Sequence, residues 1–231
     1  MAQEVEVRVK EVIQRNYNVK SVRLDLKETQ FLAGQFMQVE ISGIKRYLSI
    51  SSSPTEKCYL EFTKKITESD FSRALQLLKS GDSVRIKYPM GKFTLEDNPS
   101  QRIAFLSGGI GITPIRSIVR CVVDKNSGED IILVYANRSI KDIVFKDDLN
   151  AMQRAYAKLR VAHVLCEADP GFKCTKGMIN AQVIRDEVAD YPERRFFLCG
   201  PPQMVEAMRR ILGEELKVSQ SNIVTENFQG Y

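Results

Sequence analysis

The stretch LSGGIGITP (Leu106–Pro114) holds three glycines within four positions, followed by Thr-Pro. The apolar run RIAFLS leads into it, and the segment behind it places Ile115, Ile118, Val119 and Val122 on one helical face. A strand, a glycine turn and a helix N-terminus together form an anion site, because glycine lets the backbone approach a pyrophosphate and the free N–H groups of the helix point at it. The same pattern also describes an ordinary turn between a strand and a helix, so these residues alone leave both interpretations open.

Five residues of this stretch carry the prediction in detail. We expect Gly108, Gly109 and Gly111 to form the turn around a phosphate group. Thr113 is expected to cap the following helix, with Pro114 at the first helical position, where its missing N–H costs nothing. No Gly-Lys-Ser/Thr follows the glycines, which excludes a P-loop.

The hydropathy period changes near Asn98 and Pro99, which predicts two domains, residues 1–98 and 99–231. Before the change, short runs such as EVEVRV, SVRLDL and QFMQVEI predict an antiparallel β-barrel or sandwich. One helix interrupts them, SDFSRALQLLKSGD, with Ser69 as its N-cap and Gly81 as its stop. After the change, apolar strands alternate with helices, which predicts a parallel sheet buried on both faces. The predicted fold class is therefore an antiparallel β-barrel domain followed by an α/β parallel-sheet domain.

Composition and charge exclude several classes of protein. The chain has 231 residues, of which 43% are hydrophobic and 27% charged, as in globular proteins. The longest uncharged stretch is far shorter than the roughly 20 apolar residues of a membrane span, and the N-terminus lacks the apolar core of a signal peptide. Five cysteines without a C-x-x-C pair argue against a disulfide framework, a metal site and an iron–sulfur cluster. Because neither a membrane span nor a signal peptide is predicted, we expect a cytoplasmic protein. The net charge of +5 is spread evenly, so we expect no nucleic-acid partner.

Four segments, in this order, resemble the ferredoxin–NADP reductase superfamily of flavoproteins. They are RYLSISSSP at 46–54, GGIGITP at 108–114, LCGPPQMV at 198–205 and ENF at 226–228. The resemblance spans nearly the whole chain and implies a flavin-binding β-domain followed by a nucleotide-binding domain. It also implies an NAD(P)H-dependent reductase that passes hydride from nicotinamide to a flavin, FAD or FMN.

The resemblance implies flavin contacts in the first domain. Arg46 would meet the flavin phosphate, and the hydroxyl of Ser49 would lie near flavin N5, where the hydride arrives. Leu48 stands where the family has a tyrosine that packs along the flavin, and Tyr47 sits one place away on the opposite strand face. Weaker candidates are two residues on the EFTKKI strand and two at the start of the following helix, namely Thr63, Lys64, Phe71 and Ser72.

In the second domain the implied contacts surround the nicotinamide. LCGPP places Cys199 beside the hydride path, followed by Gly200 and Pro201. Glu226 and Phe228 match the acidic residue and the aromatic near the end of the family's chains. Tyr231 would extend the aromatic cover of the flavin. The only histidine, His163, lies within a predicted strand and is expected to pack there.

Charge at the end of the third strand of this domain favours NADH. The family often has Ser-Arg there when it binds a 2′-phosphate, whereas Cys166 and Glu167 stand here. A carboxylate repels a phosphate and can accept hydrogen bonds from a ribose diol. Lys173 and Lys176 lie nearby and could balance the charge of a 2′-phosphate, so NADPH stays an alternative coenzyme.

The electron acceptor implied by the resemblance is a separate molecule, because the chain holds no iron–sulfur ligand set. This acceptor would be a small redox protein (ferredoxin, flavodoxin or an oxygenase component) or free flavin. Two alternatives stay open: a free-flavin reductase, which Leu48 makes more credible, and an electron-transfer subunit docked in a larger complex.

Overall fold

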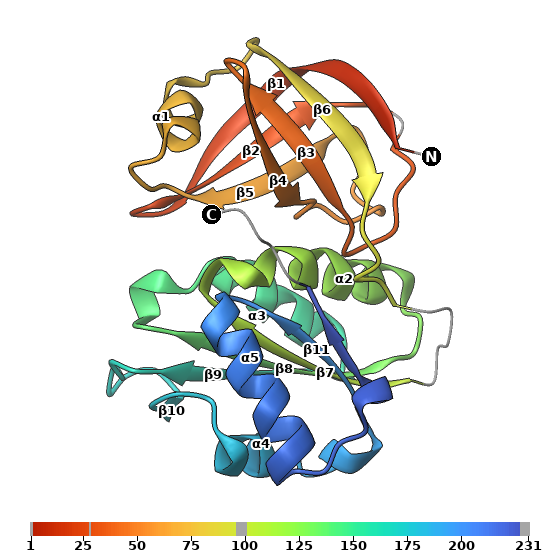
Figure 1. The fold of residues 1–231 in the computed structure, drawn as a ribbon, viewed down its shortest axis with the longest axis vertical. Helices are drawn as coiled ribbons and strands as arrows, with labels where there is room; N and C mark the ends of the chain where they lie inside the picture. The colour runs from red at the N-terminus through yellow and green to blue at the C-terminus, as the bar shows by residue number, and fades with distance from the viewer. Residues whose placement is uncertain (1, 28, 96–100, 227–231) are drawn as a thin grey trace.

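A computed structural model describes residues 2–27, 29–95 and 101–226, which form two domains stacked one above the other (Figure 1). The first contains β1 (Gln3–Asn16), β2 (Val19–Asp25), β3 (Phe36–Ile41), β4 (Ile44–Ser49), β5 (Leu60–Lys65), α1 (Asp70–Leu77) and β6 (Ser83–Met90). The second contains β7 (Arg102–Gly108), α2 (Ile112–Lys125), β8 (Asp130–Asn137), α3 (Lys146–Ala155), β9 (Leu159–Leu165), β10 (Thr175–Lys176), α4 (Ala181–Glu187), β11 (Arg195–Cys199), α5 (Pro202–Arg210) and β12 (Ile223–Thr225).

The first domain is an antiparallel barrel, as the alternating runs predict. Its strands follow the order β4-β3-β6-β1-β2-β5, and a bridge between Ile50 and Phe62 joins the two outer strands. Alternate side chains point inward and build one apolar core, which Phe71 of α1 also enters. The barrel therefore holds β4 and β5, the strands with the candidate flavin contacts, next to each other.

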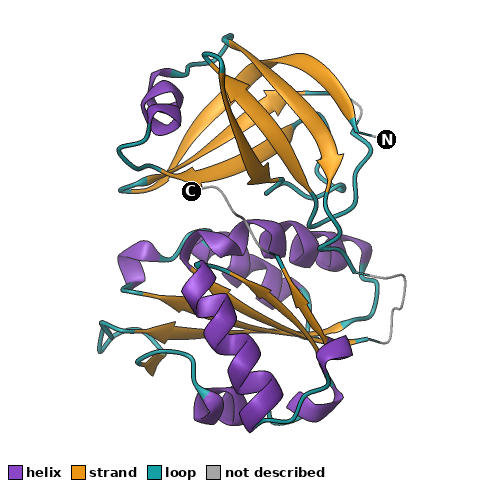
Figure 2. Cartoon of the chain, viewed as in Figure 1, coloured by secondary structure: helices purple, strands orange, loops and turns teal. Residues whose placement is uncertain are grey.

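The second domain is a parallel sheet covered on both faces. Its strand order is β10-β9-β8-β7-β11-β12, with α2 and α3 on one face and α4 and α5 on the other (Figures 1 and 2). Strands β7 and β8 are buried almost throughout, which is why their sequences are continuous apolar runs. The helix α2 lies between this sheet and the barrel (Figure 1).

Two local predictions, the end of helix α1 and the length of the first strand, need correction. Ser69 does cap α1, because its side chain accepts a hydrogen bond from the Ser72 N–H, but the helix ends at Leu77. Gly81 instead stands in the turn that leads into β6, with φ +91°. The first strand is also much longer than its alternating run, because it continues through irregularities in its pairing with β2.

The helix after the glycine turn begins earlier than predicted. A short 3₁₀ turn covers Gly109–Gly111, and α2 follows it directly at Ile112. Thr113 therefore lies inside the first turn and is not the N-cap, and its hydroxyl donates to the Ile110 carbonyl at 3.1 Å. Pro114 also stands within this first turn, where backbone N–H groups lack helical partners in any case.

Within the described residues, no helix is both long and apolar enough to cross a membrane.

Candidate active site between the two domains

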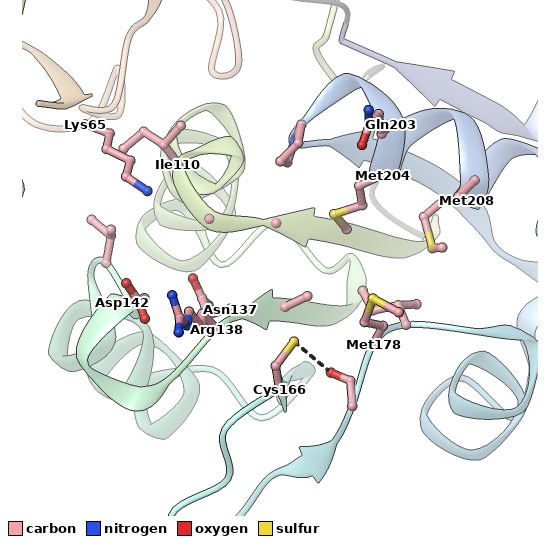
Figure 3. Close-up of a pocket in the computed structure, with 18 of the residues that line it drawn as sticks. Lys65, Ile110, Asn137, Arg138, Asp142, Cys166, Met178, Gln203, Met204 and Met208 are labelled. Atoms are coloured by element: carbon pink, nitrogen blue, oxygen red, sulfur yellow. Dashed lines mark hydrogen bonds between the residues drawn. The ribbon is translucent and has the colours of Figure 1, made fainter. Parts of the chain in front are cut away.

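The carboxyl ends of the parallel strands open into a cavity of about 560 Å³ that both domains line (Figure 3). The barrel contributes Lys65 at the end of β5, and the sheet contributes Asn137 and Arg138 at the end of β8. Figure 3 shows Lys65 across the cavity from these two residues, with Met204 and other apolar side chains toward its far end. Ligands of open parallel sheets bind at this edge, so the cavity is the candidate coenzyme site.

Close packing explains why Gly108 and Gly111 are glycines, and a positive φ explains Gly109. A Cβ on Gly111 would stand 2.3 Å from the Cys199 carbonyl oxygen, and one on Gly108 would stand 2.3 Å from the Met204 sulfur. These two glycines thus let the turn pack against the end of β11 and the start of α5. Gly109 lines the cavity with φ +52° and no neighbour within 4 Å of an added Cβ, which leaves its backbone open to a ligand.

Tyr135 holds the open part of the turn in place. It is fully buried on β8, and its hydroxyl donates to the Gly109 carbonyl at 2.9 Å. The Val144 N–H points at the same hydroxyl oxygen at 3.4 Å, so the turn is tied to the segment before α3. Burial raises the pKa of Tyr135 far above its usual range and keeps this hydroxyl protonated.

Three polar side chains near this edge have buried atoms without a hydrogen-bond partner. They belong to Ser107 at the end of β7, Asn137 at the end of β8 and Glu226 just after β12. Neither end of the Asn137 amide makes a hydrogen bond of ordinary geometry, although the amide approaches the Tyr135 hydroxyl closely enough to lower its pKa against the larger effect of burial. The Asn137 side chain is 8% exposed and lines the cavity. Buried polar groups are rarely left this way, so their placement fits a polar ligand such as the ribose and carboxamide groups of a nicotinamide nucleotide.

Cys199 lies between two of these groups. The strand register pairs it with Ser107 on β7, and the N–H of Glu226 binds the carbonyl of the preceding residue, Leu198, at 3.1 Å. Burial, with a smaller contribution from Glu226, raises the pKa of Cys199 well above its usual range, so the thiol is neutral. Burial also raises the pKa of Glu226 to about 7. The site thus presents a neutral thiol beside a carboxyl group that can hold a proton near neutral pH.

The candidate flavin residues of the barrel form a cationic group. Arg46 is half-buried on β4, Lys64 is 7% exposed on β5, and Ser49 is buried at the end of β4. Burial lowers the pKa of Lys64, and the charges of Arg46 and Lys65 lower it further. Three cations held this close suit an anionic ligand, and a flavin phosphate has the required charge.

Tyr47 and Leu48 lie on opposite faces of β4. Leu48 is 9% exposed and belongs to the barrel core, so little of its side chain is available to a flavin. Tyr47 is 51% exposed, and its ring meets the Phe36 ring edge to face with 5.9 Å between centroids. The aromatic surface near β4 is therefore on the face opposite Leu48.

Three weaker candidates are held within the barrel. The hydroxyl of Thr63 is bound to the hydroxyls of Ser21 at 2.6 Å and Ser51 at 2.9 Å. Phe71 is fully buried in the apolar core. Ser72 is also fully buried, and its hydroxyl accepts from the Thr67 N–H at 3.1 Å. Packing accounts for these three residues, and their contact with a flavin stays a prediction.

Of the residues predicted to bear on coenzyme choice, Cys166 lines the cavity. Glu167 accepts a hydrogen bond from Arg138 at 2.7 Å, and both side chains are exposed. Arg138 lines the cavity, and sequence reasoning missed it although it directly follows a predicted strand. Lys173 lies near Glu187: burial raises the pKa of Glu187, but Arg160 and Thr175, with a smaller contribution from Lys173, bring that pKa below its ordinary value. Lys176 is exposed on the short strand β10.

The remaining predicted residues divide between the described and undescribed parts of the chain. Gly200 lies between β11 and α5, close to Gly108, and Pro201 precedes α5 and lines the cavity. Phe228 and Tyr231 lie outside the described residues. His163 is buried on β9 between the rings of Tyr135 and Phe172, as expected for a packed histidine.

Two family models match the chain one after the other. The oxidoreductase FAD-binding domain matches residues 4–95, and the oxidoreductase NAD-binding domain matches residues 105–210. Together they cover both structural domains and include the candidate residues of the glycine turn and of strand β4.

Two relatives of the chain are named as reductases. The glycine betaine monooxygenase reductase subunit of Pseudomonas aeruginosa is 31% identical over 218 residues, with 89% of this chain and 59% of that protein covered. The NADH-cytochrome b5 reductase 1 of Aspergillus terreus is 29% identical over 174 residues, with 72% and 59% covered. The chain thus spans about three fifths of the length of these relatives.

Solved structures show the same two-domain fold. A ferredoxin reductase in carbazole 1,9a-dioxygenase is 26% identical, with a TM-score of 0.83 over 98% of this chain and 70% of that one. The cytochrome b5 reductase domain of Ulva prolifera nitrate reductase is 21% identical, with a TM-score of 0.85 over 97% of both chains.

Proposed function

The chain belongs to the ferredoxin–NADP reductase superfamily of flavoprotein oxidoreductases, and on this premise we propose that it uses NADH to reduce a flavin and passes the electrons to a separate acceptor. One observation carries the proposal. A single cavity brings Lys65 of the flavin-type barrel opposite Asn137 and the open glycine turn of the nucleotide-type sheet. The proposed domains are residues 1–98 and 99–231.

Residues of the barrel suit the flavin. Arg46 and Lys64 would hold its phosphate, and Ser49 would stand at its reactive edge. A flavin, when bound, accepts hydride and releases electrons. The protein's part is to place the two ring systems together and to exclude water, for which the burial of Ser49 and Cys199 is suited.

Residues of the sheet suit the nicotinamide nucleotide. The backbone at Gly109 would approach the pyrophosphate, and the unpartnered amide of Asn137 would bind the ribose or the carboxamide. Cys199 contributes a small neutral surface beside the reacting edge. Glu226 holds a proton at its carboxyl group below about pH 7, which suits a residue that exchanges protons beside a redox centre.

The coenzyme in this proposal is NADH. Glu167 occupies one side of the Arg138 guanidinium at the cavity mouth, so that cation is already balanced. A 2′-phosphate would have to displace this carboxylate, whereas a ribose diol could donate hydrogen bonds to it.

The electron acceptor is proposed to be a small redox protein or an oxygenase component, in line with the names of the relatives. Those relatives include proteins named as reductase subunits. The proposal therefore includes a role for this chain as the reductase subunit of a larger complex. One observation favours a second function, a free-flavin reductase: Leu48 faces the barrel core and presents little surface to stack on a flavin.

Flavin titration of the purified protein tests the proposal. We expect FAD or FMN to be carried or taken up at micromolar concentration. Arg46→Gln should weaken binding by about 10-fold to 100-fold, because a charge-assisted hydrogen bond contributes about 1.5–3 kcal/mol. Lys45→Gln is the matched control, since Lys45 is exposed beside Arg46 and pairs with Glu40.

The outcomes separate the two functions. Uptake at micromolar concentration with a specific loss in Arg46→Gln supports a held flavin. Weak uptake with rapid turnover of added flavin by NADH would favour the free-flavin reductase. Absence of both flavin uptake and NADH oxidation in the presence of flavin would refute both functions.

A further inference from the structure

Arg116 is a buried arginine that joins the two domains. It lies on α2, its side chain is 4% exposed, and its guanidinium forks onto both carboxylate oxygens of Glu56 in the barrel. It also donates to the Ser51 carbonyl at 3.1 Å and to Asp148 of α3 at 2.9 and 3.2 Å. One side chain thus binds two sites in the barrel and a second helix of its own domain.

Neighbouring contacts extend this junction along α2. The Ser117 hydroxyl donates to the Ser52 carbonyl at 2.6 Å, and the Thr55 hydroxyl donates to Asp124. Ser51, Ser52 and Ser53 are all fully buried. The serine run that follows β4 is therefore the barrel's contact with α2, which we call the interdomain junction (Ser51–Glu56 against Arg116, Ser117 and Asp124).

An aromatic ring lies between cations from the two domains. The Phe145 ring, just before α3, has the guanidinium of Arg116 5.5 Å from its centroid and that of Arg15 on β1 4.9 Å from it. Arg15 in turn pairs with the buried Glu61 of β5 at 2.9 Å. Burial alone would raise the pKa of Glu56, but the Arg116 guanidinium brings that pKa below its ordinary value, so the pair stays ionised.

Along the chain, the junction adjoins both halves of the candidate active site. Ser51 stands two residues after Ser49, the proposed flavin contact, and Arg116 stands five residues after Gly111 of the glycine turn. A shift of Arg116 relative to Ser51 would therefore move the flavin edge relative to the nicotinamide edge. Hydride transfer is sensitive to such shifts, since a misplacement of about 1 Å can cost about 100-fold in rate.

We infer that Arg116 is a positioning residue that sets the distance between flavin and nicotinamide by fastening Ser51 and Glu56 of the barrel to α2. This inference rests on the proposed function. It assigns Arg116 no contact with either cofactor. Its forked geometry is the essential feature, because a lysine retains the charge but has only three N–H donors on one nitrogen for the five hydrogen bonds that Arg116 makes.

The matched control is Arg194, which is just as buried but lies far from the junction. Its side chain is also 4% exposed, and it pairs with Asp130 and Asp190 within the second domain. It further donates to the carbonyls of Ile103 and Asp130, where β7 and β8 begin. Arg194→Lys therefore removes a comparable buried fork at the sheet edge opposite the active site.

The experiment compares wild type, Arg116→Lys, Glu56→Gln and Arg194→Lys. In anaerobic stopped flow with NADH and FAD-loaded protein, we expect the limiting rate of flavin reduction to fall about 10-fold to 100-fold in Arg116→Lys and Glu56→Gln. The KM for NADH and the Kd for FAD should change less than about threefold. Arg194→Lys should lower thermal stability to a similar extent while it keeps the wild-type rate.

A second measurement needs no cofactor. Amide hydrogen exchange at residues 51–56 of the flavin-free protein should become faster in Arg116→Lys and stay unchanged in Arg194→Lys. Wild-type flavin reduction by NADH decides the proposed function separately. If wild type reduces its flavin but Arg116→Lys matches Arg194→Lys in rate or in exchange at residues 51–56, the positioning role is refuted.

Discussion

Substitution of Gly111 by alanine tests why the turn needs glycine at this position. The new Cβ would stand 2.3 Å from the Cys199 carbonyl oxygen and 2.6 Å from the Gly200 Cα, and both are backbone atoms. The φ of Gly111 is −61°, which alanine adopts freely, so the clash is the whole effect. Relief to an ordinary contact requires a displacement of about 1 Å between the turn and the end of β11.

The expected magnitude follows from this displacement. Overpacking costs about 1–3 kcal/mol, and each kcal/mol lowers the melting temperature of a protein of this size by about 2–4 °C. Because Cys199 moves with its carbonyl, flavin reduction by NADH should slow by up to about 100-fold. Thermal melts and anaerobic stopped flow measure the two effects.

Gly109→Ala is the matched comparison. Nothing lies within 4 Å of its added Cβ, but φ is +52°, so the strain costs about 1–2 kcal/mol. Its methyl group would enter the cavity where we place the pyrophosphate, and therefore KM for NADH should rise more than the limiting rate falls. Wild-type rate and stability in Gly111→Ala, or a larger loss of limiting rate in Gly109→Ala, would refute this reasoning.

Three further predictions concern single side chains. Glu167→Gln should raise kcat/KM for NADPH relative to NADH by about fivefold, since an exposed charge is worth at most about 1 kcal/mol; an unchanged ratio in steady-state assays would exclude Glu167 from coenzyme choice. The raised pKa of Glu226, about 7 against an ordinary 4.5, keeps its carboxyl protonated in the folded protein below about pH 7. Wild type should therefore lose stability relative to Glu226→Gln as pH rises from about 4.5 to about 7 and no further, and parallel melting curves across that range would contradict this. Cys199→Ala should slow flavin reduction by about 100-fold in stopped flow with little change in NADH binding, and a wild-type rate would remove the thiol from the hydride path.

Local pattern was sufficient to predict the elements of both domains except the two-residue strand β10. Alternating runs identify the barrel strands and continuous apolar runs identify the buried parallel strands, because each pattern reflects which faces are covered. The motif at 108–114 was placed correctly between a strand and a helix. Its cap was not, since a 3₁₀ turn at Gly109–Gly111 leads straight into the helix at Ile112.

Contacts between the domains could not be predicted from local pattern. Ser51–Ser53 reads as part of a flavin motif, yet these serines are buried against α2. Arg116 reads as one polar residue of an amphipathic helix, although tertiary packing buries it. Asn137 directly follows a predicted strand. Because parallel sheets bind ligands at the carboxyl ends of their strands, this position alone could have identified Asn137 as a candidate ligand contact.

Anaerobic addition of one equivalent of NADH to the FAD-loaded protein shows whether the flavin accepts hydride from NADH. We expect the absorbance of oxidised flavin to bleach in proportion to the NADH added, and to return when an electron acceptor is supplied. Protein that binds FAD but shows no bleaching with either NADH or NADPH would contradict this expectation.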